Sequence, residues 1–250
     1  MIQIGDCTLY QGDCLEIMPT LGKVDAVVTD PPYEVTPTSK THYTNPGMIN
    51  GGWMAKSYPV NHGKMFEIPD FAEWMSLAFN ASKANADAYF MSNDKTLPDM
   101  QKAAGLSGWK FHNILVWQKP MGIPNRWYFK DCEFTIYCWK GKAKTIKNPS
   151  STQTFKAAHT KERTHPSEKP VALLSHYIEN STGKGDAILD PFMGSGTTGV
   201  ACAKLGRKFI GIELEPKYFD IACQRIEAAY KQPDLFVEPP AKAVQGGLNL

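Results

Sequence analysis

Continuous apolar runs alternate with amphipathic stretches along most of this chain. Such runs are typical of strands buried on both faces of a parallel sheet, whereas apolar residues spaced three and four apart indicate helices. The pattern predicts strands over residues 7–13, 24–30, 86–93, 109–120, 186–192 and 208–214. It predicts helices over residues 13–21, 70–85, 95–108, 170–180, 195–206 and 215–230.

Strands that alternate with helices favour an α/β fold with a mostly parallel sheet. The stretch 133–141 differs, because its apolar and polar residues alternate and predict an antiparallel partner strand. Residues 34–69 are rich in Thr, Asn, Gly, Pro and Lys without any period, which predicts a mobile loop that could form a lid. We therefore expect one domain over residues 1–232 and a frayed tail over 233–250.

The composition is that of a globular protein. The 250 residues are 42% hydrophobic and 21% charged, and the formal net charge is only +2. No apolar run approaches the roughly 18 residues that span a bilayer, and the first residues lack the pattern of a secretory signal, so we expect a cytoplasmic protein. No two of the six cysteines have the C-x-x-C spacing of a metal or redox motif, and we expect no metal site.

A glycine turn between two predicted strands has the features of a nucleoside-binding unit. Residues 188–214, ILDPFMGSGTTGVACAKLGRKFIGIEL, contain a strand, the turn, a helix and a second strand that ends in an acid. Gly194 and Gly196 allow the backbone to approach a ligand closely, and the helix N-terminus offers free N–H groups. Glu213 ends the second strand, where a carboxylate can bind both ribose hydroxyls.

The acid in front of this turn indicates which nucleoside compound would bind. Asp190 would repel the pyrophosphate of a dinucleotide but would accept an ammonium group. S-adenosylmethionine carries an ammonium, a carboxylate, a sulfonium and a ribose, so it fits this stretch better than NAD does. We therefore expect S-adenosylmethionine as the cofactor.

The tetrapeptide Asp30-Pro31-Pro32-Tyr33 ends the apolar run at 24–29. A carboxylate at the carboxyl end of a parallel strand points into the crevice where such folds bind ligands. Prolines lack N–H groups, so the carbonyls of Asp30 and Pro31 can be directed outward. These groups could hold an exocyclic amine, with Asp30 and the Pro31 carbonyl accepting its hydrogens while Tyr33 stacks on the ring.

Such a clamp suits methyl transfer to nitrogen. The lone pair of an adenine amine is shared with the ring, and two acceptors would localise it on the nitrogen. The nitrogen could then attack a methyl sulfonium in line, while Asp30 stabilises the developing positive charge and takes the proton late. Methylation at cytosine C5 would need a cysteine nucleophile, usually in a Pro-Cys dipeptide, and the sequence contains no such dipeptide.

The two motifs resemble the hallmarks of the amino-methyltransferases of DNA, which are D-P-P-Y and D-P-F-x-G-S-G. Here they are residues 30–33 and 190–196, in an order similar to that of the β group. The resemblance implies an α/β, Rossmann-like methyltransferase fold with a permuted, mostly parallel, seven-stranded sheet. It also implies a small target-recognition insertion, for which residues 120–163 are available. The similarity covers roughly residues 7–33, 86–140 and 163–228.

The resemblance also implies roles for individual residues. The segment QGDCLE would contact the adenine of the cofactor through Asp13, and HPSEKP would hold its methionine end through Ser167 and Lys169. Phe192 would lie against the cofactor. The implied cofactor-binding residues are Asp13, Cys14, Asp30, Ser167, Lys169, Asp190, Phe192, Gly194, Ser195, Gly196 and Glu213. The implied catalytic residues are Asp30, Pro31, Pro32 and Tyr33.

The family implies N6 of adenine in double-stranded DNA as the target when the tetrapeptide begins with Asp. Serine at that position is typical of N4-cytosine methylation, which is the alternative. An RNA or protein methyltransferase and a DNA-binding relic without turnover are two further alternatives. A base in a duplex must be flipped out of the stack at a cost of a few kcal/mol, and the loop 34–69 could close over it.

Positive charge is concentrated between residues 140 and 169, where eight basic residues outnumber two acidic ones. Clustered basic residues are the electrostatic footprint of nucleic-acid binding. The candidate DNA contacts are Arg126, Lys140, Lys142, Lys144 and Lys147. The short recognition region suggests a short target site or a homodimer. A cognate restriction endonuclease could accompany the protein in a prokaryote or a phage.

Overall fold

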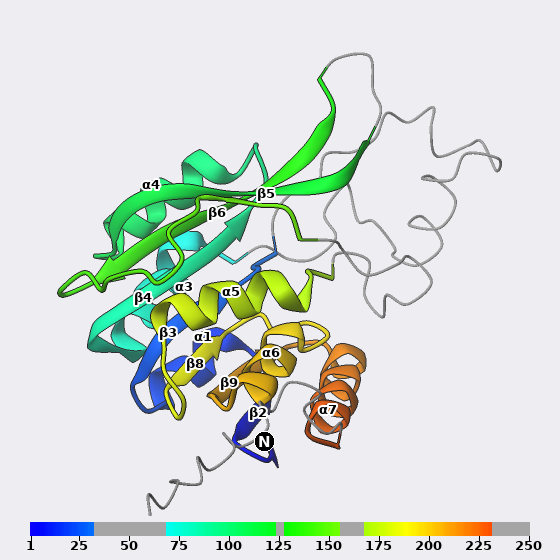
Figure 1. Ribbon diagram of the computed structural model, residues 1–250. Helices are drawn as coiled ribbons and strands as arrows, with labels where there is room; N and C mark the ends of the chain where they lie inside the picture. The colour runs from blue at the N-terminus through cyan, green and yellow to red at the C-terminus, as the bar shows by residue number, and fades with distance from the viewer. Residues whose placement is uncertain (33–68, 124–127, 156–167, 232–250) are drawn as a thin grey trace, which may run out of the picture.

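The computed structural model describes residues 1–32, 69–123, 128–155 and 168–231. In this part of the chain, nine strands form one sheet in the order β1-β2-β9-β8-β3-β4-β6-β5-β7 (Figure 1). The strands are β1 (Ile2–Ile4), β2 (Cys7–Gln11), β3 (Val24–Thr29), β4 (Ser82–Ser92), β5 (Lys110–Ile123), β6 (Lys130–Lys140), β7 (Thr152–Gln153), β8 (Ala187–Asp190) and β9 (Lys208–Glu213). The helices are α1 (Cys14–Ile17), the short 3₁₀ helix η1 (Met18–Thr20), α3 (Phe71–Ala81), α4 (Leu97–Leu106), α5 (Val171–Ser181), α6 (Thr197–Leu205) and α7 (Pro216–Lys231).

Helices cover both faces of the sheet and give a three-layer arrangement (Figure 1). On one face, α5, α6 and α7 bury side chains such as Tyr177 and Ile226. On the other face, α1, α3 and α4 bury Trp74 and its neighbours. Successive residues of β3 belong to the two cores in turn, Val28 to the first and Val27 to the second. This double burial explains why β3 is apolar over most of its length.

The structure confirms the expected α/β class and the mostly parallel sheet. Strands β2, β9, β8, β3 and β4 run parallel to one another. Strand β6 is antiparallel to both β4 and β5, as the alternation over 133–141 predicts. Two short edge strands, β1 and β7, extend the expected seven strands to nine. They contain three and two residues, too few to produce a hydrophobic pattern.

Several element boundaries differ from the predicted ones by a few residues, and two of the differences have a clear physical cause. The helix expected over 70–85 ends at Ala81, because pairing with β3 begins at Ser82 and overrides the helical pattern. Strand β5 was expected to end at Pro120 but continues to Ile123. Its ladder with β6 is irregular around this proline, so the missing N–H is not required there.

The carboxyl ends of the parallel strands lie at one edge of the sheet. Strands β3 and β8 are neighbours, yet the next described helix after β3, α3, packs on one face and the helix after β8, α6, packs on the other. Ligands bind at such switch points in open α/β sheets. Asp30 follows β3 and the turn 191–196 follows β8, so the fold brings the two motifs together. The tetrapeptide strand also precedes the glycine-turn strand in the sequence, which is the permuted order.

Two predictions fall outside the described residues. The loop over 34–69, apart from its last residue, and the tail over 233–250 both lie there. Among the helices of the described part, none is both long enough and apolar enough to cross a membrane.

Candidate active site

The turn after β8, residues 191–196, exposes its backbone to the crevice. Gly194 and Gly196 have φ angles of +51° and +78°, in the left-handed region that favours glycine. A Cβ on Gly196 would lie 2.8 Å from the Cβ of Ala222, so this glycine also allows α7 to approach. A Cβ on Gly194 would meet nothing within 4 Å, which shows that the turn faces open space at this residue.

Glu213 ends β9 beside this turn. Its Oε2 accepts a hydrogen bond of 2.9 Å from the N–H of Gly194, and its Oε1 accepts one of 2.8 Å from the N–H of Glu215. Burial raises the pKa of the Glu213 carboxyl. Asp13 lies near Glu213, because the residue before it, Gly12, donates its N–H to the Glu213 carbonyl over 3.0 Å. The structure therefore brings together two of the acids that were predicted to bind the cofactor.

Asp190 is buried at the end of β8, and groups of the protein itself occupy both of its oxygens. Oδ1 accepts a 2.7 Å hydrogen bond from the Thr29 hydroxyl and a 3.1 Å hydrogen bond from the Phe192 N–H. Oδ2 accepts a 2.6 Å hydrogen bond from the Thr198 hydroxyl. Burial raises the pKa of Asp190 to about 6. The predicted contact with an ammonium group stays a prediction, and the observed bonds show that Asp190 joins β3, the turn and α6.

Asp30 follows directly after Thr29, and its side chain begins a row of alternating charges. The ammonium of Lys169 donates to Oδ2 of Asp30 over 2.6 Å and lies 3.1 Å from Oε2 of Glu133. The ammonium of Lys119 lies 2.6 Å from Oε1 of the same glutamate. Burial alone would raise the pKa of Glu133, but Lys169 and Lys119 lower it to about 2. The cofactor contact implied for Lys169 stays a prediction, to which the structure adds this bond with Asp30.

Sequence reasoning missed Glu133 and Lys119 as neighbours of the tetrapeptide. Glu133 comes from β6 and Lys119 from β5. The only signal in the sequence is that each is a charged residue in a largely apolar strand. Pairing of β6 with the end of β4 carries Glu133 to the crevice, and that pairing could not be derived from the sequence.

A second network connects Glu168, just before α5, with the glycine turn. Arg225 of α7 donates from Nη1 to the carbonyl and hydroxyl oxygens of Ser195, both over 2.7 Å. Its Nη2 donates to Oε1 of Glu168 over 2.5 Å. Arg225 was also missed, because one arginine in an amphipathic helix resembles ordinary surface charge.

The other predicted cofactor residues occupy different surroundings. Asp13 caps α1, since its Oδ1 accepts a hydrogen bond of 2.8 Å from the N–H of Leu15. Cys14 is buried in the core, and burial raises the pKa of its thiol to about 12. Phe192 packs edge-on against Trp74, with ring centroids 5.2 Å apart. Thus Asp13 and Phe192 lie at the crevice edge of the sheet, whereas the Cys14 thiol belongs to the interior.

Comparison with known proteins agrees with this geometry. A family model described as DNA methylase matches residues 24–224. The chain belongs to the DNA methylase family. The methylase is 32% identical over 232 residues to the type II methyltransferase M2.DpnII of Streptococcus pneumoniae, with 82% of this chain and 83% of that protein covered. It is 29% identical over 245 residues to the type II methyltransferase M2.MboI of Moraxella bovis, with 87% and 86% covered.

A solved structure extends the comparison to three dimensions. The crystal structure of an M1.HpyAVI–SAM complex has 28% sequence identity and a TM-score of 0.67, and the match covers 88% of the methylase and 98% of that chain. The methylase is a DNA amino-methyltransferase that uses S-adenosylmethionine. Its residues fit this cofactor, because the turn opens onto free space at Gly194 and the acids Asp13 and Glu213 flank it.

The structure separates the predicted DNA-binding lysines from the crevice. Lys140 pairs with Ala86 near the start of β4, whereas Asp30 follows the end of the parallel strand β3. Lys140, Lys142, Lys144 and Lys147 therefore lie toward the opposite edge of the sheet. The ammonium of Lys140 donates to two backbone carbonyls over 2.7 and 3.0 Å, and that of Lys144 donates to another over 3.0 Å. These bonds give both lysines a structural role.

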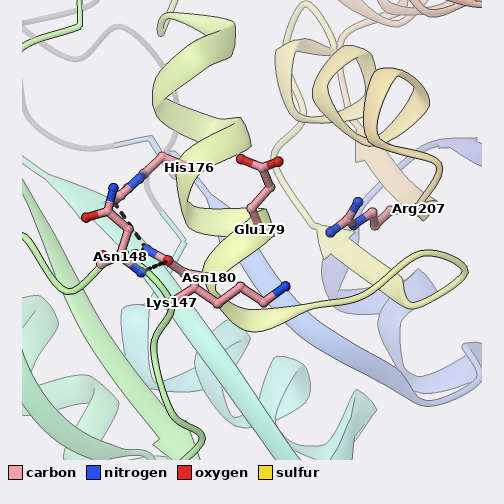
Figure 2. A pocket seen from close by; sticks show the side chains of 6 residues that line it. All are labelled: Lys147, Asn148, His176, Glu179, Asn180 and Arg207. Atoms are coloured by element: carbon pink, nitrogen blue, oxygen red, sulfur yellow. Dashed lines mark hydrogen bonds between the residues drawn. The ribbon is translucent and has the colours of Figure 1, made fainter. Parts of the chain in front are cut away.

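Lys147 lines a pocket beside the C-terminal end of α5, far from the glycine turn. Figure 2 shows its lining residues, which are Lys147, Asn148, His176, Glu179, Asn180 and Arg207. Asn180 joins the 147–148 segment to α5, because it accepts a hydrogen bond from the Asn148 N–H over 2.9 Å and donates one to the Asn148 carbonyl over 3.1 Å. The segment is thus anchored at the amino edge of the sheet.

Three predicted site residues, Tyr33, Ser167 and Arg126, lie outside the described residues, so their roles stay predictions. Pro31 is buried and Pro32 is half-buried next to Asp30. Within the described ranges, no group of three or more His, Cys, Asp or Glu side chains is arranged to hold a metal ion.

Proposed function

We propose that Asp30 and the Pro31 carbonyl accept the hydrogens of the adenine N6 amine in double-stranded DNA, while Tyr33 stacks on the flipped base. The observation that carries this proposal is the position of Asp30 at the switch point, beside the glycine turn. The lone pair of the amine is shared with the ring. Two acceptors would therefore localise it on nitrogen and make that nitrogen a nucleophile.

When bound, S-adenosylmethionine supplies a methyl group on a positively charged sulfur. Asp13 and Glu213 would hold the nucleoside part, and the backbone at Gly194 would lie against the ligand. Asp30 stabilises the positive charge that develops on N6 and takes the proton after the new C–N bond has formed. Holding the amine close to the methyl group lowers the barrier further.

The test is incubation with labelled S-adenosylmethionine and mixed-sequence DNA, followed by digestion to nucleosides. We expect label in N6-methyladenine. We expect Asp30→Asn to lower kcat by about 100-fold or more, because the neutral amide cannot stabilise the developing charge. Label in N4-methylcytosine would support the alternative target, and faster labelling of RNA than of DNA would remove DNA as the substrate. Full activity of Asp30→Asn would reject the role of Asp30.

The β5–β6 hairpin is the element best placed to contact the target sequence. Its strands continue beyond the end of β4, with Gln118 paired to Cys132, and the hairpin projects from the sheet (Figure 1). Tyr128 and Phe129 near its tip are 96% and 62% exposed. Exposed aromatic side chains next to a crevice are suited to contact unstacked bases.

The type II designation of the relatives supports a role in restriction and modification. The methylase would act in the cytoplasm of a prokaryote or on phage DNA, protecting sites that a cognate endonuclease cuts. The short recognition region supports a homodimer that shares recognition between two copies. Sequencing of methylated bases in cells that express the protein would give the target site. Light scattering of the purified protein would give the molar mass in solution and therefore the number of chains in the oligomer.

A further inference from the structure

Four charged side chains form one row that leads from the catalytic acid to the β5–β6 hairpin. The row is Asp30, Lys169, Glu133 and Lys119, and its successive ion pairs measure 2.6, 3.1 and 2.6 Å. Lys169 stands between two carboxylates and is only 7% exposed. Its ammonium is therefore shared by Asp30 and Glu133 where solvent screens it little.

Glu133 is the carboxylate of this row that the chemistry described above does not use. Its side chain in β6 is 22% exposed, and a carboxylate that is largely removed from water is stable only with good partners. Burial alone would raise the pKa of Glu133, but Lys169 and Lys119 lower it to about 2, so the carboxylate is ionised at neutral pH. Glu133 thus supplies a fixed negative charge behind Lys169.

The balance of charge shows how Glu133 acts on Asp30. Asp30 and Lys169 alone would make a neutral pair, and the ammonium would weaken the carboxylate as an acceptor. Adding Glu133 gives the three groups a net negative charge, and the ammonium is drawn partly toward Glu133. A net negative charge stabilises the cation that forms when the amine is methylated. Lys119 acts in the opposite direction, because it neutralises part of the Glu133 charge.

Resting on the role of Asp30 proposed above, we propose that Glu133 is a positioning residue for methyl transfer. It fixes the ammonium of Lys169 and offsets its charge, so that Asp30 remains a strong acceptor for the amine. Glu133 itself touches neither base nor cofactor. Its removal should therefore slow the chemical step without weakening cofactor binding.

The test compares Glu133→Gln, Glu133→Asp and Lys119→Met in the full-length protein. The matched control is Glu227→Gln, which breaks an exposed ion pair on α7. Single-turnover rates with saturating DNA and cofactor report the chemical step. Calorimetric titration with S-adenosylmethionine, without DNA, reports cofactor binding independently of activity.

We expect Glu133→Gln to lower the single-turnover rate by about 10- to 100-fold while the Kd for S-adenosylmethionine stays within about threefold. Glu133→Asp keeps the charge and should recover most of the rate. Lys119→Met removes the charge that opposes Glu133 and should raise the rate. The control should match the wild type in rate and in Kd.

Wild-type rates for Glu133→Gln would overturn the proposal, as would a Kd that weakens as much as the rate falls. If Glu133→Gln does not fold, the single-turnover rate of Lys119→Met decides whether the row acts on Asp30 or is only structural. A tenfold fall in its rate would mean that the row only holds the hairpin in place. The proposed function fails separately, since then the wild-type protein would not methylate adenine in any DNA.

Discussion

Asp190 and Glu133 show how burial and charged partners together set the charge of a carboxylate at this crevice. Burial raises the pKa of Asp190 to about 6, because its hydroxyl and N–H partners offset only part of the desolvation. Burial would also raise the pKa of Glu133, yet two ammonium groups lower it to about 2. One carboxyl can therefore take up a proton near neutral pH, whereas the other stays ionised.

Asp190→Asn should change how stability depends on pH. The folded pKa of about 6 lies above the ordinary value of 3.8, so the folded state binds the proton more tightly than the unfolded state. The stability gained from this proton is present below the ordinary pKa and is lost as the pH rises through the folded value. Between about pH 4 and pH 6, the wild type should lose about 2 kcal/mol of unfolding free energy more than the variant. Urea unfolding at several pH values measures the difference, and equal slopes would contradict this account of Asp190.

Arg225→Ala should weaken cofactor binding. The arginine fixes Ser195 in the glycine turn and links it to Glu168, so its loss leaves the turn less ordered before the ligand arrives. We expect the Kd for S-adenosylmethionine to rise by about tenfold. Gln224→Ala, the exposed neighbour in α7, is the matched control and should bind like the wild type. Equal Kd values for the two variants would exclude this role of Arg225.

At the scale of elements, the contact of α6 with α7 depends on the absence of a side chain at Gly199. A Cβ there would collide with Ile226 and would lie 2.8 Å from the ring of Phe209. Gly199→Ala should therefore lower the unfolding free energy by about 1–3 kcal/mol, although alanine is the better helix former. Gly105→Ala in α4 meets nothing within 4 Å and should raise it by about 0.5–1 kcal/mol. Denaturant unfolding of both variants measures these changes, and shifts in the same direction would contradict the packing described for Gly199.

Elements with a strong hydrophobic pattern could be predicted from the sequence, whereas elements that depend on pairing with a neighbouring strand could not. Strand β3 and helix α7 follow from their apolar periodicity, since each has a buried face over its whole length. The short strands β1 and β7 exist because a neighbour offers hydrogen bonds at the sheet edge. The candidate site divides in the same way. Both motifs are local and predictable, whereas the row from Asp30 to Lys119 requires four segments that meet only in the fold.

At the scale of the whole molecule, positive residues that are close in the sequence lie at different edges of the sheet. Strand β6 returns the chain to the amino edge of the sheet, so the lysines just after it, such as Lys142 and Lys144, lie away from the crevice. Lys169 belongs to the same stretch of positive charge, yet it lies beside Asp30 at the crevice. The number of positive residues over 140–169 therefore does not show at which edge of the sheet each of them lies.

Lys142→Ala and Lys147→Ala should therefore leave the KM for DNA within about twofold of the wild-type value, because these residues are remote from the base. The double variant Tyr128→Ala/Phe129→Ala should raise this KM by about tenfold through the loss of exposed aromatic contacts. Steady-state rates at two salt concentrations measure both effects. A larger effect of the lysine variants would move the DNA path to the other edge of the sheet.

The reversed direction of β6 has a consequence for how new specificities could arise. Because β6 runs against β4, the chain reaches the crevice as a hairpin whose two stems are locked together from Gln118 and Cys132 inward. Residues 120–131 between these stems can be exchanged or lengthened without removing Lys119 or moving Asp30 or the glycine turn, since neither Asp30 nor the turn depends on them for backbone pairing. Exchange of this one segment would thus direct the enzyme to another DNA recognition sequence. Related enzymes could differ in specificity in this way while the residues that carry out methyl transfer stay the same.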